Sequence, residues 1–167
     1  MIRDNIDDKE LVISILRSLN ENQEKCKDWL IEKCGPYLQV LDDPKICVAA
    51  GWYGLLASKL KDFTDNEIVS FDIDPKCKII GKKLYPNDNI VFKTDDINKF
   101  KAKKYDVVIC TSCEHFSDEY LQKFLKKVKE GTLVILQSNN YFGLDEHINC
   151  KNNLGEFEWS VNINVLW

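Results

Sequence analysis

Glycine and aspartate residues that could bind a ligand stand at the ends of the first two short apolar runs of this sequence. Gly51 ends the run over residues 45–50, and Gly54 follows it. Glycine lets the backbone approach a ligand closely, and a helix that starts there offers unpaired N–H groups. Asp72 ends the second run, where a carboxylate can bind both hydroxyls of a ribose. The alternative for the glycines is a tight strand-to-helix turn without a ligand.

Two more acids, Asp95 and Asp96, follow the third apolar run. A carboxylate there can accept a hydrogen bond from an exocyclic amine such as that of adenine. It can equally cap a turn or a helix. The same alternative applies to Asp72, but Asp74 can cap the next helix, which leaves Asp72 free for a ligand. Together the acids predict a nucleoside site at the ends of the strands.

Glu114 and His115 follow the fourth apolar run and are the titratable pair of this region. A histidine or a carboxylate at the mouth of a cleft can act as a general acid or base. The alternative is structural: Glu114 makes local contacts and His115 packs against a cofactor.

Cysteine and histidine spacing raises the question of a zinc site. Cys110-x-x-Cys113 and His147-x-x-Cys150 contain four possible ligands for tetrahedral zinc. Cys110 lies inside an apolar run, where its side chain can point into a core, so no metal is predicted. The pair does not open a helix, which disfavours a thioredoxin-like role. Seven unevenly spaced cysteines also argue against a disulfide framework.

The elements that must position these residues alternate between strands and helices. Strands are predicted over 45–50, 67–72, 89–93, 105–110 and 131–137, and helices over 55–60, 76–84 and 118–129. Strands that read as continuous apolar runs between helices indicate a parallel sheet covered on both faces. Right-handed crossovers then produce a doubly wound α/β fold, in which ligands bind beyond the carboxyl ends of the strands.

The two ends of the chain carry different patterns. Apolar residues predict helices over 8–19 and over 22–34, the second of which ends at Gly35-Pro36. They form an N-terminal helical cap (1–44) on an α/β core (45–167). Residues 157–167 alternate and predict an antiparallel strand at or near the sheet edge. A homo-oligomer can form through such an edge.

Composition narrows the class of protein. A chain of 167 residues suits one domain over 1–167. The net charge of −4 disfavours a nucleic-acid partner, and the lysines of 99–104 and 123–129 are interpreted as solvated faces. No segment approaches the roughly 20 apolar residues of a membrane span. The polar start of the chain does not resemble a signal peptide, so a cytoplasmic location is expected.

The ordered motifs resemble class I S-adenosylmethionine (SAM)-dependent methyltransferases over about residues 45–137. They are the strand–Gly-x-x-Gly–helix unit, residues 69–75 (Val-Ser-Phe-Asp-Ile-Asp-Pro), residues 94–100 (Thr-Asp-Asp-Ile-Asn-Lys-Phe) and residues 105–116, which end in Glu-His-Phe. The resemblance implies a Rossmann-like fold and SAM as cofactor. It puts the cofactor beside Gly51, Trp52, Tyr53, Gly54, Asp72, Asp95, Asp96, Ile97 and Thr111.

The same resemblance assigns roles. Gly51 and Gly54 would line the methionine and ribose part of SAM, Asp72 would bind the ribose hydroxyls, and Asp96 or its neighbour Asp95 the adenine amine. Glu114-His115 resembles the Glu-His pair that follows the fourth strand in many small-molecule methyltransferases. These two are therefore the predicted catalytic residues.

Two features depart from the family pattern. The family's first strand carries an acid two residues before its first glycine, and here that residue is Ala49. The glycine turn also contains Trp52 and Tyr53, whose aromatic faces can attract a sulfonium through cation–π interaction. The chain has no Asn-Pro-Pro-Tyr or Asp-Pro-Pro-Tyr, so the resemblance does not extend to enzymes that methylate amino groups of DNA bases.

The sequence thus predicts a SAM-dependent methyltransferase for an unidentified acceptor, expected to be a small molecule. The missing acid at Ala49 keeps open a non-catalytic SAM-fold binding module. A nicotinamide-dependent oxidoreductase is less favoured, because the Gly-x-Gly-x-x-Gly turn that brings a pyrophosphate close is absent.

Overall fold

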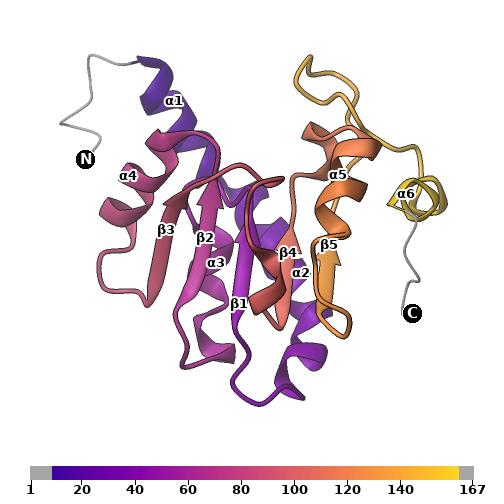
Figure 1. Cartoon of the computed structure of the whole chain (residues 1–167). Coiled ribbons are helices and arrows are strands. Elements are labelled where there is room, and N and C mark those ends of the chain that lie inside the picture. Colours follow the sequence, from indigo (N-terminus) through magenta and orange to yellow (C-terminus); the bar gives the residue numbers. More distant parts are fainter. Residues whose placement is uncertain (1–8, 162–167) are drawn as a thin grey trace.

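Five short strands form one parallel sheet in the computed structural model, which describes residues 9–161 (Figure 1). The strands are β1 (Ile46–Ala49), β2 (Ile68–Asp72), β3 (Ile90–Thr94), β4 (Val107–Cys110) and β5 (Leu133–Leu136). Their order across the sheet is β3-β2-β1-β4-β5, and every neighbouring pair is parallel. The chain therefore reverses its direction of winding between β1 and β4, which confirms the doubly wound α/β fold.

Alternate residues of the strands pack into two hydrophobic cores on opposite faces of the sheet. In β1, Cys47 and Ala49 join the core beneath α5 (Asp118–Leu125) and α6 (Leu154–Val161). Ile46 and Val48 join the core beneath α2 (Glu21–Gln39) and α3 (Leu55–Lys59). Burial of both faces explains why the strands read as unbroken apolar runs rather than as alternating ones.

The remaining helical elements connect or flank these layers. α4 (Pro75–Leu84) packs on β2 and β3, and α1 (Lys9–Ser18) lies at the carboxyl-end edge of the sheet (Figure 1). Single 3-10 turns follow α3, precede β4 and follow β4 at Lys61–Phe63, Ala102–Lys104 and Cys113–His115. None of the helices between residues 9 and 161 combines the length and the apolar character that a membrane span requires.

The second helix runs further than its sequence suggests. We expect it to end at Gly35-Pro36, but α2 contains Pro36 and continues to Gln39. A proline inside a helix removes one backbone hydrogen bond and costs about 3 kcal/mol. Leu38, which is fully buried, and Cys34 pack into the core with β1, so burial of the last turn offsets that cost. α2 therefore covers one face of the sheet.

The predicted C-terminal strand is wrong over its described part. Residues 154–161 form α6, and residues 162–167 lie outside the described range. Asn153 Oδ1 accepts from the Glu156 amide at 3.0 Å, and the Glu156 carboxylate accepts from the Asn152 amide at 3.0 Å, which closes the start of the helix. Phe157 and Val161, four residues apart, are both buried against the core. β5 is the last strand in the order, and residues 157–161 do not extend the sheet.

Candidate functional site

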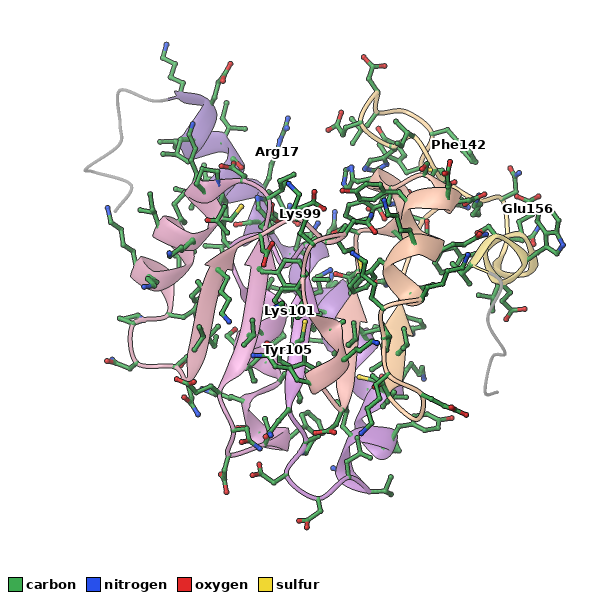
Figure 2. The ribbon with its side chains drawn as sticks, in the orientation of Figure 1. Arg17, Lys99, Lys101, Tyr105, Phe142 and Glu156 are labelled. Carbon is green, nitrogen blue, oxygen red and sulfur yellow. The ribbon has the colours of Figure 1, made fainter. Side chains whose placement is uncertain are left out.

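A cavity of about 1200 Å³ opens at the carboxyl ends of the strands, beside the point where the winding reverses. Segments from the whole chain line it: α1, the first half of α2, the β1–α3 turn, the ends of β2 and β3, the turn after β4 and the segment after β5. Arg17 on α1 and Phe142 on the loop after β5 lie on opposite sides of this edge of the sheet (Figure 2). A cavity of this size can hold a nucleoside cofactor together with a small acceptor.

The turn after β1 is shaped by a close backbone contact. A Cβ at Gly51 would lie 2.3 Å from Ser70 Oγ, so a larger residue would clash there unless Ser70 moved. Its neighbours Ala50 and Trp52 adopt φ of 49° and 48°, a left-handed conformation that non-glycine residues rarely adopt. Such strain concentrates at sites where the surrounding structure holds the backbone for a ligand.

Tyr53 and Gly54, the next two residues, connect this turn to α1 and α3. Gly54 has φ 95°, and its Cβ would lie 2.5 Å from Phe92, so it caps α3 and is not one of the cavity-lining residues. Tyr53 lines the cavity and is 4% exposed, and its hydroxyl lies 2.9 Å from Ser14 Oγ of α1. This contact attaches the N-terminal helix to the turn.

Asp72 lies at the wall of the cavity with both carboxylate oxygens oriented by the backbone. Oδ2 accepts from the Trp52 amide at 3.1 Å, and Oδ1 accepts from the Asp74 amide at 3.1 Å. Asp74 caps α4 by accepting from the Lys76 amide at 2.8 Å, as its position predicts. A carboxylate offers about four lone-pair sites, so Asp72 can still accept from two hydroxyls of a ligand.

Asp95 and Asp96 line the cavity beside Asp72, and each uses one oxygen to hold its own turn. Asp95 Oδ1 accepts from the Asp96 amide at 2.9 Å. Asp96 Oδ1 accepts from the Asn98 amide at 2.7 Å and from the Tyr120 hydroxyl at 2.6 Å. The Tyr120 hydrogen bond, followed by the Asn98 amide, lowers the pKa of Asp96. Ile97, 4% exposed, contributes an apolar surface to the same wall.

Lys27 is a further residue that lines the cavity, and the sequence patterns do not predict it. Its Nζ donates to Thr111 Oγ1 at 3.0 Å, directly after β4. Burial lowers the pKa of Lys27, while the nearby groups Cys26 and Glu114 act in the opposite direction. α2 carries Lys27 into the cavity, where Arg17 of α1 supplies a second cationic side chain. A lysine in a polar stretch of helix has no sequence signal that distinguishes it from a solvated one.

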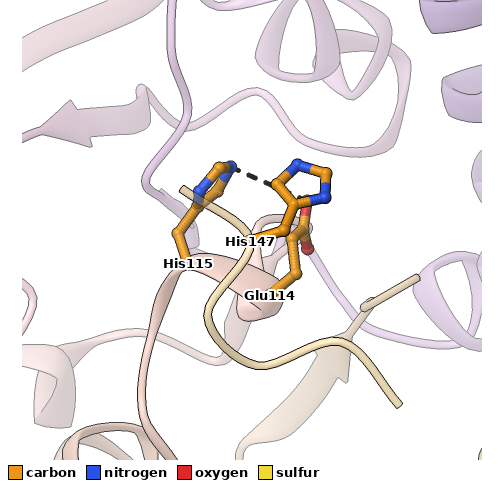
Figure 3. A group of neighbouring side chains, drawn as sticks. All are labelled: Glu114, His115 and His147. Atoms are coloured by element: carbon orange, nitrogen blue, oxygen red, sulfur yellow. Dashed lines mark ion pairs between the residues drawn. The ribbon is translucent and has the colours of Figure 1, made fainter. Parts of the chain in front are cut away.

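Glu114, His115 and His147 also line the cavity and form one group of neighbouring side chains (Figure 3). Glu114 is 8% exposed, and its Oε1 lies 3.8 Å from His115 Nε2. His147 comes from the loop after β5, and one ligand atom of each residue lies within 4.8 Å of the other two. Sequence spacing could not reveal this third member, because 32 positions separate it from His115 and no strand end announces it.

The cysteines considered as zinc ligands in the sequence do not form a metal site together. Cys110 and Cys113 are fully buried in the core, and Cys150 contacts His147 Nδ1 at 3.8 Å. Between residues 9 and 161, the group of Glu114 and the two histidines is the one that could hold a metal, and no cysteine belongs to it. At the position where the family pattern has an acid, β1 has Ala49, which offers no carboxylate and is fully buried. The residues after β5, such as Gln137 and Asn139, also line the cavity, and the strand-end rule could have identified them.

Comparison with known protein families identifies the family of this chain. Residues 46–132, more than half of the chain, match the family described as "Methyltransferase domain". A comparison with curated protein sequences finds no significant match.

Solved structures share the fold at low sequence identity. The PH0226 protein from Pyrococcus horikoshii is 22% identical and superposes with a TM-score of 0.57, covering 71% of this chain and 58% of that one. Magnesium protoporphyrin IX methyltransferase from Synechocystis, solved with bound SAH, is 18% identical with a TM-score of 0.57, covering 72% and 57%. The [4+2]-cyclase SpnF is 14% identical with a TM-score of 0.63, covering 83% and 54%. The chain thus spans little more than half the length of these structures.

Proposed function

Since this chain belongs to the methyltransferase domain family, we propose that it transfers the methyl group of SAM to a small molecule bound beside Glu114 and His115. The observation that carries the proposal is the meeting of distant segments at one cavity. The turn at Gly51, the acids at the end of β2 and directly after β3, and the pair after β4 all line it at the point where the winding reverses. Doubly wound sheets bind their ligands at this place.

The polar groups of the cavity suit the parts of SAM. Asp72 has acceptor capacity for the two ribose hydroxyls, and its backbone hydrogen bonds hold it in place. The hydrogen bonds of Asp96 within residues 9–161 use Oδ1 alone, which leaves Oδ2 for the adenine amine beside Ile97. Lys27 and Arg17 would bind the carboxylate of the methionine part. Trp52 would offer its ring to the sulfonium.

The chemistry makes modest demands on the protein. The sulfonium of SAM activates the methyl group, so the main task of the chain is to orient the acceptor. His115 Nδ1 lies 3.0 Å from the Glu146 carbonyl oxygen, which can only accept a hydrogen bond, so Nδ1 carries the hydrogen. In the neutral ring, the lone pair of Nε2 can then accept from an acceptor hydroxyl or amine. Glu114 would share this orienting role.

One observation favours a second candidate, a SAM-binding module without catalysis. Ala49 removes the carboxylate that would otherwise hold the cofactor amine, and it is fully buried. The fold by itself does not establish methyl transfer, because a [4+2]-cyclase also adopts it. Release of S-adenosylhomocysteine (SAH) in the presence of small hydroxyl- and amine-bearing acceptors would establish catalysis.

Calorimetry provides the first test of the proposal. Titration of the chain with SAM and with SAH should each give a one-to-one complex of micromolar affinity, on the order of −8 kcal/mol. NAD should give no heat under the same conditions. Clear binding of NAD without binding of SAM or SAH would instead support an oxidoreductase and refute the proposal.

A further inference from the structure

We propose that Glu114, His115 and His147 bind a divalent transition-metal ion at the acceptor end of the cavity. One ligand atom from each side chain lies within 4.8 Å of the other two, and Glu114 Oε1 is 3.8 Å from His115 Nε2. Two ligand atoms on a tetrahedral ion, each about 2.1 Å from it, are separated by about 3.4 Å. Small side-chain rotations would therefore bring the three groups to coordination distance (Figure 3).

In both histidines a hydrogen bond at Nδ1 leaves Nε2 available to bind a metal. His115 Nδ1 lies 3.0 Å from the Glu146 carbonyl oxygen, and His147 Nδ1 lies 2.9 Å from the Tyr141 carbonyl oxygen. A carbonyl oxygen only accepts, so each Nδ1 carries a hydrogen, and in the neutral imidazole, the form that binds metals, each Nε2 has a free lone pair. Metal-binding histidines commonly donate their second N–H to such a carbonyl, which fixes the tautomer and the ring orientation.

Glu114 provides a second and independent observation. Its side chain is 8% exposed, and Oε2 is buried without a hydrogen-bond partner among the described residues. A buried carboxylate oxygen without a partner costs free energy unless a cation or a donor compensates it. Lys27, whose charge acts on Glu114, donates instead to Thr111. A metal ion between the carboxylate and the two imidazoles would satisfy Oε2.

The loop that carries His147 is attached to the Glu114 turn by its backbone. The Asn149 amide donates to the Glu114 carbonyl oxygen at 2.9 Å, and the Asn149 side chain donates to Asp118 at 2.8 Å. Lys151 forms an ion pair with the same carboxylate at 2.9 Å. These contacts hold His147 opposite Glu114 before any ligand arrives, so the site is largely preorganised.

The ligand set indicates which ions fit and what they would do. Two imidazoles and one carboxylate bind zinc in catalytic sites and are also found with iron, and three protein ligands leave coordination positions open. All three residues line the cavity, so an open position faces the space of the acceptor. The ion would bind an oxygen of the acceptor and lower its pKa, which points to a hydroxyl-bearing acceptor.

The reaction at this ion, which rests on the proposed function, balances without another reactant. The metal-bound hydroxyl releases its proton to water. Its oxygen then forms a bond to the methyl carbon while the carbon–sulfur bond breaks, and the electron pair of that bond stays on sulfur. In this arrangement His115 is a metal ligand, and it orients the acceptor through the ion.

Metal titration tests the site directly. Protein dialysed against a chelator is titrated with Zn²⁺ by calorimetry and with Co²⁺ by visible absorption. We expect one tight site per chain. His147→Ala and Glu114→Gln should each weaken it by about a hundredfold or more, because each changes a direct ligand and changes to the residues that only hold the ligands already cost about 10–100-fold. Glu146→Gln is the matched control, because its carboxylate lies on the same loop but only its backbone contacts His115.

The outcomes separate the site from the cofactor. Equal affinity in wild type and His147→Ala, or an equal loss in Glu146→Gln, would overturn the metal site; thermal unfolding in chelator shows whether the variants remain folded. SAH is titrated in parallel, also in chelator. SAH binding without Zn²⁺ or Co²⁺ binding refutes the metal site and leaves the proposed function intact. The reverse result supports the metal site and refutes the cofactor assignment.

Discussion

The hydroxyl group of Tyr120, on α5, lies 2.6 Å from Oδ1 of Asp96, in the turn after β3. This contact joins two elements that are distant in the chain at the wall of the cavity. It stabilises the ionised carboxylate and, as the first of several causes, lowers the pKa of Asp96. The same hydrogen bond raises the pKa of Tyr120, since ionising the phenol would remove the donor.

The first prediction concerns the response of this pair to acid. The folded pKa of Asp96 lies below its unfolded value, so its contribution to stability is present above the unfolded pKa and is lost as the pH falls through the folded pKa. Tyr120→Phe should raise the pKa of Asp96 toward the ordinary value of about 3.9. Carboxyl NMR titration measures this shift. An unchanged pKa in Tyr120→Phe would show that the Asn98 amide and the nearby lysines maintain it without the hydroxyl.

The second prediction tests the ribose contact. Asp72→Asn keeps the shape of the side chain but removes the charge and half of the acceptor capacity, so SAH affinity should fall about tenfold or more, at least ~1.4 kcal/mol. Asp88→Asn, a carboxylate far from the cavity lining, is the matched control and should bind SAH like the wild type. Calorimetry measures both. Equal affinity in the two variants would remove Asp72 from the cofactor site.

The third prediction localises Lys27. Lys27→Met keeps the length of the side chain and removes its charge, so it should weaken SAH by about tenfold, the scale of a charge-assisted contact. Methylthioadenosine lacks the amino-acid part of SAH, so its affinity should stay nearly constant. A parallel loss for both ligands in calorimetry would mean that Lys27 shapes the cavity rather than binding the carboxylate.

The fourth prediction separates acceptor residues from cofactor residues. His115→Ala should reduce SAH affinity far less than Asp72→Asn does, because His115 follows β4, which is separated from β2 and its terminal Asp72 by β1. Once an acceptor is found, turnover should fall about a hundredfold or more. A large loss of SAH affinity in His115→Ala would move this residue to the cofactor side of the cavity.

The fifth prediction examines the packing under the turn. A Cβ at Gly51 would lie 2.3 Å from Ser70 Oγ, so Gly51→Ala should lower the free energy of unfolding by about 1–3 kcal/mol. Ser70 Oγ is buried without a partner among the described residues, so Ser70→Ala should be nearly neutral or stabilising. In the double variant the loss should be partly rescued. Urea unfolding measures the coupling, and strict additivity would disprove the clash.

Local sequence patterns determined the sheet and part of the site. Apolar runs such as 107–110 mark strands that are buried on both faces, and polar residues directly after such runs must meet at one edge of a parallel sheet. Asp72, Asp96 and Glu114 could therefore be identified before their distances were known. The cap at Asp74 could also be predicted, because its hydrogen bond joins residues only two positions apart in the chain.

The tertiary structure decided what depends on contacts between distant segments. Alternation over 157–161 suits a strand, but the Asn153–Glu156 cap and a core that accepts Phe157 and Val161 favour a helix. Burial of Leu38 likewise carries α2 through a proline. His147 enters the site because the Asn149 amide binds the Glu114 carbonyl group, a contact between residues 35 positions apart. Local periodicity reports the preference of one segment, whereas the free energy that selects these conformations comes from its distant partners.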